Sequence, residues 1–481
     1  MSNPELDKLI KPEKMHGGLK FFLWVAGLTL TVVIAWLAID LTGLKAWQKH
    51  VVAMRSQGID LEGGGYSPAP VPDEDNTFKE PTLESIAIKA IPLTSAATRL
   101  LSPPSPFDPA MPPPLASLLS WDPQGEGMPE AGKLEIENRP KTPGHFILAH
   151  YASESNTLAR IYAACDRPRS RVDLQYGDWE NGGIPDFVQL RKLAQAFSLR
   201  ARANLAVGDT KAALEDLNVI RRLALMSEGR PTTIVQAMIE VAIAGLMTTV
   251  IEEGIQEGAL SVQACLELQE QLEFFDLPAS YAFSIKKGEI PGVTGQVMNA
   301  PDQIMGSFAS GPMAYLPKGV FQRNLIAYSE TLNDMLSGID LEKGVVDPSV
   351  IDQHDATLQT AFESFSIATF LAKIMIPNLT KATQTAARNQ MRIRMARIAC
   401  ALEAFRLEHE VFPEQLEDLS PRFIDPLPAD IITGQPPVYH LTGPSEYRLY
   451  SVGWNQADDG GEAENDIDWV WLGGQPRTEK E

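Results

Sequence analysis

An uninterrupted apolar segment near the N-terminus constrains this chain more than any other feature. The nineteen residues from Phe21 to Ile39 contain no charged side chain. As a helix rising about 1.5 Å per residue, the segment spans roughly 28 Å, close to the ~30 Å hydrocarbon core of a bilayer. Trp24 and Trp36 lie near its two ends, where indole side chains prefer the membrane interface. The sequence therefore predicts one transmembrane helix over residues 21–39.

A cleaved signal peptide is the alternative interpretation of this segment. Its apolar region would be only about 7 to 15 residues long and would end in a small-x-small cleavage site. The observed run is longer, and residues 38–41 (AIDL) offer no convincing site. Lysines before the span outnumber the basic residues that follow it closely, which favours a cytoplasmic tail over residues 1–20. We therefore expect a single-pass protein of the bacterial inner (cytoplasmic) membrane, with its bulk in the periplasm.

A second apolar stretch, from Ile234 to Ile251, is interpreted differently. It contains Gln236 and Glu240, and two glutamates follow it directly. Polar residues of this kind are costly in a bilayer but are tolerated where a protein interior provides partners. The stretch therefore predicts a buried core helix.

The charge balance excludes nucleic acid as a partner. The 481 residues include 62 acidic and 41 basic side chains, which gives a net charge of −21. Nucleic-acid phosphates require a basic surface, and this chain is acidic. The expected partners are the membrane, through residues 21–39, and other envelope proteins.

Composition divides the rest of the chain into segments. Gly63 to Gly65 and the dense prolines as far as Pro114 predict an extended spacer, with Phe107 and Trp121 as candidates for docking onto the body. The expected order is a cytoplasmic tail (1–20), a transmembrane helix (21–39), a juxtamembrane segment with a proline-rich spacer (40–145), a helical body (146–377), a C-terminal module (378–474) and a disordered tail (475–481).

Helical periodicity dominates the body. Apolar residues from Leu190 to Leu205 recur at helical spacing, and a second helix follows Gly208 and Asp209. The pair resembles a tetratricopeptide-type hairpin, although no copy follows at the period that such an array requires. Further helices are predicted over 232–256, 261–275 (capped by Ser261), 320–336, 349–376 and 379–410, and an irregular connection over 292–317.

Beyond residue 410 the pattern changes from helix to strand. After a short helix (414–419), three segments rich in β-branched and aromatic residues predict strands over 438–441, 447–452 and 467–472. Trp469 and Trp471 alternate with Val470, so both indoles belong to one face. The predicted fold class is mainly α, with irregular helical hairpins, one N-terminal transmembrane helix, and a small α+β C-terminal module of one long helix and about three antiparallel strands.

This module resembles the C-terminal half of the major pseudopilin of type II secretion systems. The matching stretches are ALEAFRLEHEVFP, LPADIITGQPPVYHL, YRLYSVGWN and, after an acidic GG-containing loop, NDIDW. Two pseudopilin features are missing: the anchor lacks the glycine, phenylalanine and glutamate that prepilin peptidase reads, and a long stretch of chain separates it from the module. A pilus subunit is therefore not expected.

In the pseudopilin family the acidic loop binds calcium, so the resemblance implies calcium as a ligand here. The first aspartate of the family's loop falls on Asn455, and its aspartate before isoleucine falls on Asp466. Asn455 departs from the pattern, since an amide is a weaker ligand than a carboxylate, but Asp458 or Asp459 can substitute after a small shift. Calcium needs six to eight converging oxygen atoms, and the loop concentrates such donors. The alternative is a solvated acidic hairpin tip.

The whole chain is similar to an uncharacterised family of single-pass bacterial envelope proteins. The shared pattern comprises the N-terminal span, a proline-rich stretch with VPDEDN (Val71 to Asn76), a helix with LRARANLAVGD, and a C-terminal YSVGWN…DDGG…DWVW. This resemblance implies an envelope location and does not imply a particular activity.

Catalytic motifs do not emerge from the residues. Cys165, Cys265 and Cys400 share no CxxC spacing and are expected to be buried. An oxidising compartment would allow two of them to form one disulfide. His145 and His150 lack partners with metal-ligand spacing, so surface or capping roles are expected.

Two further clusters receive ordinary structural interpretations. Residues 284–287 match SxxK, but the accompanying elements of penicillin-binding proteins are absent, so the match is attributed to chance. The arginines between Arg388 and Arg397 are expected to pair with the acidic body.

Three functions remain open from the sequence. The leading hypothesis is a membrane-anchored extracytoplasmic scaffold that binds other proteins and is held away from the membrane by its spacer. An accessory component of a type II secretion or pilus-like machine is the second. The third is an anchored hydrolase that uses carboxylates, which requires a deep acidic cleft.

Overall fold

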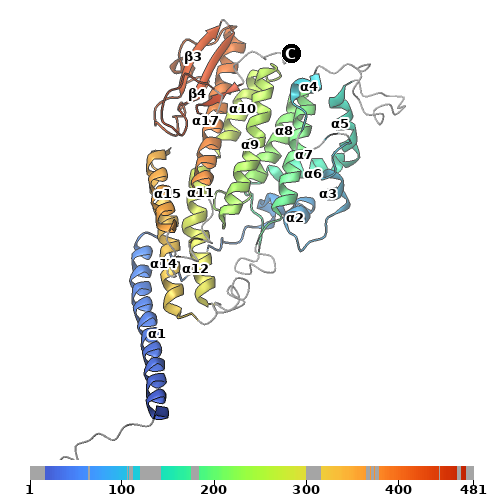
Figure 1. Cartoon of the computed structure of the whole chain (residues 1–481). Coiled ribbons are helices and arrows are strands. Elements are labelled where there is room, and N and C mark those ends of the chain that lie inside the picture. Colours follow the sequence, from blue (N-terminus) through green and yellow to red (C-terminus); the bar gives the residue numbers. More distant parts are fainter. Residues whose placement is uncertain are drawn as a thin grey trace, which may run out of the picture.

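A computed structural model of the chain shows a helical body from which one long helix projects (Figure 1). A small antiparallel sheet lies near the C-terminus, beside the last long helix. The predicted mainly α fold with a small C-terminal sheet is therefore confirmed. The structure describes residues 17–62, 66–105, 107, 112–119, 142–174, 184–299, 316–363, 369, 373, 379–443, 445–462 and 467–472.

Helix α1 (Gly17–Ser56) has two different halves. Its large apolar side chains from Leu19 to Leu44 are exposed, and this part is long and apolar enough to cross a membrane. Its C-terminal half instead packs against α14 (Lys318–Met335). The buried residues of this half recur at helical spacing: Gly43, Trp47, His50, Val51 and Met54.

Much of the predicted spacer is instead part of the folded body. Residues 40–56 continue α1 without a break, and the described residues from 66 to 105 contain buried side chains such as Phe78 and Ile86. Pro81 lies in the first helical turn, where a missing amide hydrogen costs nothing, so this proline starts a helix rather than extending the chain. The short elements here are η1 (Asp73–Asp75), η2 (Thr77–Lys79), α2 (Pro81–Ala87), α3 (Ser95–Leu100) and α4 (Leu115–Leu119).

The body consequently packs directly against the C-terminal half of α1, and the described part of the predicted spacer does not separate the two. Phe107 does dock onto the core, with its ring 6.3 Å from that of Phe146. Trp121 lies outside the described residues, as do the tail 475–481 and residues 1–16.

Helices of the body pack around one continuous hydrophobic core. α7 contacts α8 and α9, and α17 contacts α9, α10 and α11. The elements are α5 (Pro143–Tyr151), η4 (Ala152–Glu154), α6 (Ser155–Cys165), α7 (Phe187–Ala206), α8 (Thr210–Ala224), α9 (Ile234–Gln256), α10 (Val262–Glu273), α11 (Leu277–Phe283), the π-helical η5 (Ser284–Glu289), α12 (Ile290–Asn299), η7 (Leu336–Gly338), α15 (Pro348–Glu363) and α17 (Leu379–His409).

The second apolar stretch forms α9 at the centre of this body. Ile243, Met247 and Ile251 are fully buried there, and α9 contacts α7, α8 and α17. α9 is therefore a core helix, as its polar residues predicted.

Helix starts agree well with the sequence, whereas one connection does not. The Ser261 hydroxyl accepts a hydrogen bond from the Ala264 amide (3.2 Å) and caps α10 as predicted. Helical structure continues from α11 through η5 and α12 to residue 299, although an irregular connection was predicted from residue 292. Gly288 allows a close approach here, because a Cβ atom at this position would lie 2.1 Å from the Thr232 carbonyl oxygen.

The C-terminal strands appear where they were predicted. After η8 (Leu416–Leu419), the strands β3 (Val438–Gly443), β4 (Glu446–Ser451) and β5 (Trp469–Trp471) form an antiparallel sheet in the order β3-β4-β5. Trp469 and Trp471 are both buried, which confirms that they share the inner face. A separate two-stranded pairing of β1 (Ile339–Asp340) with β2 (Val345–Val346) was not predicted.

Candidate functional site

The described part of the acidic loop does not gather its predicted calcium ligands around one point. Asn455 Nδ2 donates to Asp459 Oδ2 (2.7 Å), and Asp458 Oδ1 accepts from Tyr450 OH (2.9 Å). All three predicted ligands are exposed. No three His, Cys, Asp or Glu side chains are grouped to hold a metal ion in the described part of the chain. Asp466 lies outside that part, so calcium binding stays a prediction.

Asp468, at the end of the same loop, is buried. Its Oδ2 atom accepts a hydrogen bond from the Gly461 amide (2.7 Å), whereas its Oδ1 atom has no hydrogen-bond partner among the described residues. A buried carboxylate oxygen without a partner is a costly feature. A cation beside the loop would provide such a partner, although the described carboxylates Asp458 and Asp459 bind other side chains of the loop and sheet.

A cavity of about 680 Å³ opens where the C-terminal end of α8 meets the α10–α11 junction. The segment 168–170 and the turn after α8 complete its wall. Its most distinctive feature is a set of four arginines, placed by three separate stretches of chain: Arg169, Arg221, Arg222 and Arg230. Such a concentration of positive charge is unexpected in a chain whose net charge is −21.

Arg221 is buried in the wall of this cavity, with 7% of its surface exposed. Its guanidinium donates to Asn218 Oδ1 through Nε (3.1 Å) and Nη2 (2.7 Å), and it lies 4.7 Å from the centre of the Phe274 ring. Burial and the neighbouring charge of Arg222 together lower the pKa of Arg221 to about 10. The amide and the ring therefore hold the cation in place without neutralising it.

Arg222 is held by backbone carbonyl groups. Its Nε donates to the Cys165 carbonyl (2.8 Å) and its Nη2 to the Arg167 carbonyl (2.6 Å). Burial lowers the pKa of this guanidinium as well. Neither Arg221 nor Arg222 forms an ion pair with a carboxylate of the described residues.

Arg169, in contrast, has an acidic partner. Its Nε and Nη2 atoms each lie 2.5 Å from a carboxylate oxygen of Glu228, which also accepts from the Ser170 amide (3.2 Å). Burial alone would raise the pKa of Glu228, but its hydrogen bonds with Arg169 and the charge of Arg169 lower it. This bidentate pair fixes one edge of the cavity.

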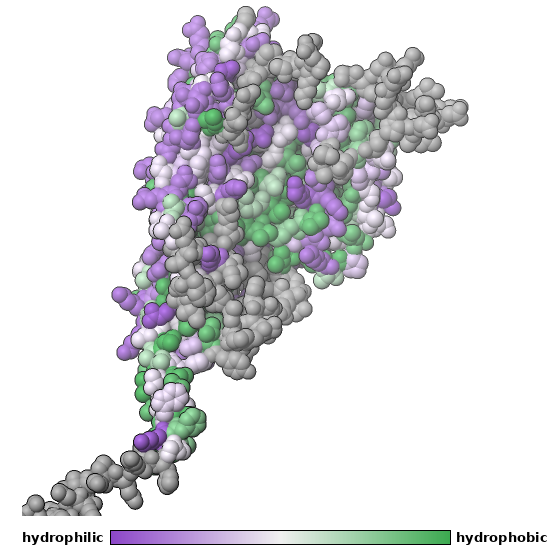
Figure 2. All heavy atoms as spheres, in the orientation of Figure 1, coloured by the Kyte–Doolittle hydropathy of each residue, from purple (hydrophilic) through white to green (hydrophobic). Residues whose placement is uncertain are grey.

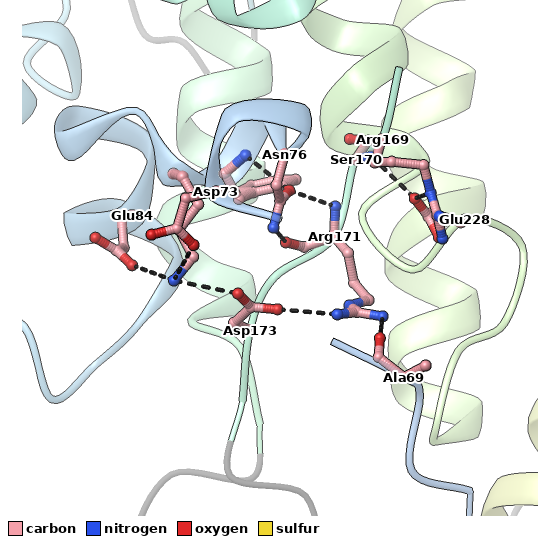
Figure 3. Close-up of polar contacts among 11 residues, drawn as sticks. Ala69, Asp73, Asn76, Glu84, Arg169, Ser170, Arg171, Asp173 and Glu228 are labelled. Carbon is pink, nitrogen blue, oxygen red and sulfur yellow. Dashed lines mark hydrogen bonds and ion pairs between the residues drawn. The ribbon is translucent and has the colours of Figure 1, made fainter. Parts of the chain in front are cut away.

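The VPDEDN stretch binds residues 169–171, of which Arg169 and Ser170 line the cavity (Figure 3). Asn76 is fully buried, and its side chain bonds both backbone groups of Arg171, with Nδ2 donating to the carbonyl (2.8 Å) and Oδ1 accepting from the amide (3.0 Å). The Thr77 amide donates to the Arg169 carbonyl (2.9 Å), and the Arg169 amide donates to the Asp75 carbonyl (2.9 Å). These bonds set the position of residues 169–171.

Ion pairs extend this support around the same stretch. Arg171 donates to the Ala69 carbonyl and to Asp173 Oδ1 (3.2 Å), and Lys79 pairs with Asp173 and Glu84 (both 3.1 Å). Figure 3 shows these contacts joining the segment near Asp73 to the strand-like segment that carries Arg171. The conspicuous sequence motif therefore supports the site and does not line the cavity itself.

Other residues singled out in the sequence have structural roles. The Ser284 hydroxyl donates to the Tyr281 carbonyl (2.7 Å), while Lys287 Nζ donates to the Gly58 carbonyl (2.5 Å), so the SxxK pair is engaged elsewhere. All three cysteines are buried and free: Cys165, Cys265 and Cys400.

The predicted capping and pairing roles are confirmed. His145 Nδ1 lies 2.8 Å from the Thr142 hydroxyl at the start of α5, and His150 Nε2 lies 2.9 Å from the Ser102 carbonyl. The arginines of α17 bind the body in ion pairs that join Arg392 to Glu252 (3.0 Å) and Arg397 to Glu273 (3.2 Å).

Sequence reasoning missed the cavity because its arginines come from distant segments. The available signals were the basic run RPRSR (167–171) and the pair Arg221-Arg222 at the end of an amphipathic helix. A basic helix end is ordinary, since cations there interact favourably with the helix dipole. No family model matches this chain, and neither a curated protein nor a solved structure matches it.

Proposed function

We propose that the protein is a membrane-anchored scaffold of the bacterial envelope, whose body lies outside the cytoplasm and binds other envelope proteins. The observation that carries this proposal is the division of α1 into an exposed apolar half and a half that is packed into the body. Figure 2 shows hydrophobic residues along the projecting part of α1, whereas the upper part of the body is mostly hydrophilic. Such a helix is suited to a bilayer, and the body is suited to water.

The junction between α1 and α14 supports a fixed position of the body at the membrane surface. The backbones approach so closely that a Cβ atom on Gly43 would lie 2.3 Å from Gly319 Cα. Asp40, directly after the apolar run, accepts a hydrogen bond from the Gly319 amide (2.8 Å). A rigid junction at this point presents the same faces of the body to neighbouring proteins.

Exposed apolar side chains on the body are candidates for partner binding. Val188 and Val235, each in the first turn of its helix, are 65% and 60% exposed. Single exposed apolar side chains are ordinary on a protein surface, so these two valines serve as probe positions on two helices of the body.

A role in a type II secretion or pilus-like machine is the second proposal. The order of a long helix (α17), a turn-rich crossing and a three-stranded antiparallel sheet favours it, because this is the order of the pseudopilin pieces. α17 is buried against α9 and α10, so in this proposal the sheet side serves as a docking element. The third candidate, an anchored hydrolase, receives no support from the cavity described above, whose lining is mainly basic.

Site-specific photo-cross-linking in intact membranes tests the scaffold proposal. A photoreactive phenylalanine analogue replaces Val188 or Val235, and a third variant carries it at Lys211, an exposed polar position in the first turn of α8. We expect discrete adducts with other envelope proteins from the valine positions and not from Lys211. Adducts with secretion components would favour the second proposal, and identical patterns from all three positions would contradict the scaffold.

A further inference from the structure

We propose that the arginine-rich cavity binds a phosphate monoester group of a ligand. This inference goes beyond the scaffold function and does not depend on it. The lining contributes four guanidinium groups and two carboxylates, Glu228 and Asp276, so two positive charges remain in excess. The excess lies on a protein with a net charge of −21, which makes an accidental basic surface a poor explanation.

The excess positive charge of the cavity lies on those arginines that form no ion pair with a carboxylate of the described residues. Glu228 is engaged by Arg169, and Asp276 is exposed and accepts from the Ala279 amide (3.1 Å) as the cap of α11. Arg221 and Arg222 form no ion pair with the described carboxylates. Arg222 is partly buried and is attracted by Asp166 and Glu228, whereas Arg221 is buried and has no carboxylate beside it among the described residues. Burying a cation without a counter-charge is costly, and an anion bound beside Arg221 would remove that cost.

The form of the cavity favours an organic phosphate over an inorganic ion alone. A volume of about 680 Å³ exceeds the needs of a single anion and lies within the range of small-molecule sites. Phe274, 65% exposed, provides an apolar wall that is already stacked with Arg221 on one side. An aromatic or other planar group attached to the phosphate can pack against this ring.

Charge matching favours a phosphate monoester over a carboxylate. A phosphate monoester carries about −1.5 to −2 charges at neutral pH, whereas a carboxylate carries one. Guanidinium groups bind phosphate oxygens through paired, charge-assisted hydrogen bonds. Arg221 lies in the buried wall and Arg230 lies at the exposed rim, so the anion can be held from two sides.

The test uses the full-length protein in maltoside detergent. Inorganic phosphate and phenyl phosphate are titrated separately by calorimetry, with sodium chloride at equal ionic strength as the reference. The variants are Arg221→Gln, Arg230→Gln and Phe274→Ala, and the matched control is Arg191→Gln, an exposed arginine of α7 outside the cavity. Arg230 and Phe274 are exposed, so their variants remain informative where the buried Arg221→Gln variant fails to fold.

We expect saturable binding of both probes to the wild type and to Arg191→Gln, and affinity about ten-fold or more lower in the arginine variants. Phenyl phosphate should bind more tightly than phosphate, and Phe274→Ala should abolish that difference. Heat changes no larger than those of sodium chloride would overturn the proposal, as would equal affinity in Arg230→Gln and Arg191→Gln.

A phosphate monoester can come from a soluble metabolite or from a lipid headgroup, and two further arms distinguish these sources. In one, the protein lies in nanodiscs of zwitterionic lipid and is titrated with phenyl phosphate. In the other, the nanodiscs contain phosphatidic acid, and competition against phenyl phosphate is measured. Competition by the lipid supports the phosphate site with a lipid source, and undiminished binding supports it with a soluble source.

Discussion

Glu240 is a carboxyl group buried in the middle of α9, and it forms no ion pair with a described residue. The Ser227 hydroxyl donates to it, and 2% of its surface is exposed. Burial raises its pKa to about 8. Since an unfolded glutamate titrates near 4.5, the folded protein holds a proton between these values that the unfolded chain has released. The contribution of Glu240 to the free energy of unfolding should therefore fall as the pH rises from about 4.5 to about 8, and level off above.

The Glu240→Gln variant should lose this pH dependence. Glutamine is neutral at every pH, so the variant should gain stability relative to the wild type as the pH rises, by roughly 2–4 kcal/mol at pH 8. Thermal melts at pH 5 and pH 8 measure the difference. The control is Glu270→Gln at an exposed position of α10. We expect its melting temperature to change between pH 5 and pH 8 by as much as that of the wild type. Equal pH dependence in wild type and Glu240→Gln would show that Glu240 is not buried as described.

A second buried carboxylate belongs to a network of polar partners that compensates its charge. Asp216 is fully buried and accepts from Tyr162 OH (2.7 Å), Arg200 Nε (3.2 Å) and Asn204 Nδ2 (2.8 Å). Removing one partner leaves a buried charge without compensation, so Asp216→Ala should destabilise the protein by about 3–5 kcal/mol. Denaturant unfolding measures the cost. Loss of less than 1 kcal/mol would contradict the burial of this network.

Individual residues were predicted well where the chemistry is local. Ser261 as a helix cap and the burial of Trp469 and Trp471 follow from their immediate neighbours in sequence. Asn76 and Arg221 acquire their roles from segments that meet only in the fold, at Arg171 and at Phe274. Sequence periodicity does not reveal which distant segments of the chain contact each other in the fold.

At the level of elements, the contact between α1 and α14 depends on two glycines. Gly43→Leu places a side chain where the Gly319 backbone already lies, and overpacking of this kind costs about 1–3 kcal/mol. We expect the variant to melt several degrees below the wild type in detergent and to remain in the membrane after an alkaline wash. Gly27→Leu is the matched control, because no atom lies within 4 Å of its added Cβ. Equal melting of both variants would contradict the packed junction.

Helices and strands were predicted more reliably than the regions between them. The periodic segments became α7, α8, α9 and α17 with nearly the expected ends. The prolines between residues 40 and 145 predicted an extended spacer, although Pro81 and Pro143 lie in the first turn of helices. Proline restricts the chain equally in both settings, and burial of residues such as Phe78 decides which one occurs.

At the scale of the molecule, the C-terminal segment is joined to the body through α17 and through Leu472 after β5. Gln390 accepts from the Leu277 amide (2.9 Å) and donates to the Phe275 carbonyl (3.1 Å). The Leu472 amide donates to Glu252 (2.8 Å), and Gln256 donates to the Leu472 carbonyl (2.8 Å). The sheet and its helix therefore depend on the body for their polar partners as well as for their packing.

An isolated fragment of residues 378–474 should consequently not fold as a unit. The face of α17 that meets α9 and α10 would be exposed to water in the fragment. We expect poorly dispersed amide signals in NMR and no cooperative thermal transition, whereas the full chain should show one. A dispersed spectrum with a sharp melt would identify an autonomous module and would strengthen the pseudopilin proposal.

The most direct test of the membrane-anchored arrangement is labelling of single cysteines with a membrane-impermeant maleimide in spheroplasts. The three native cysteines are at most 1% exposed, so they add little background. Lys211→Cys reports on the body and Ser2→Cys on the N-terminal tail. The account predicts that Lys211→Cys reacts in sealed spheroplasts and that Ser2→Cys reacts only after permeabilisation. Protection of Lys211→Cys until permeabilisation would contradict it and place the body in the cytoplasm.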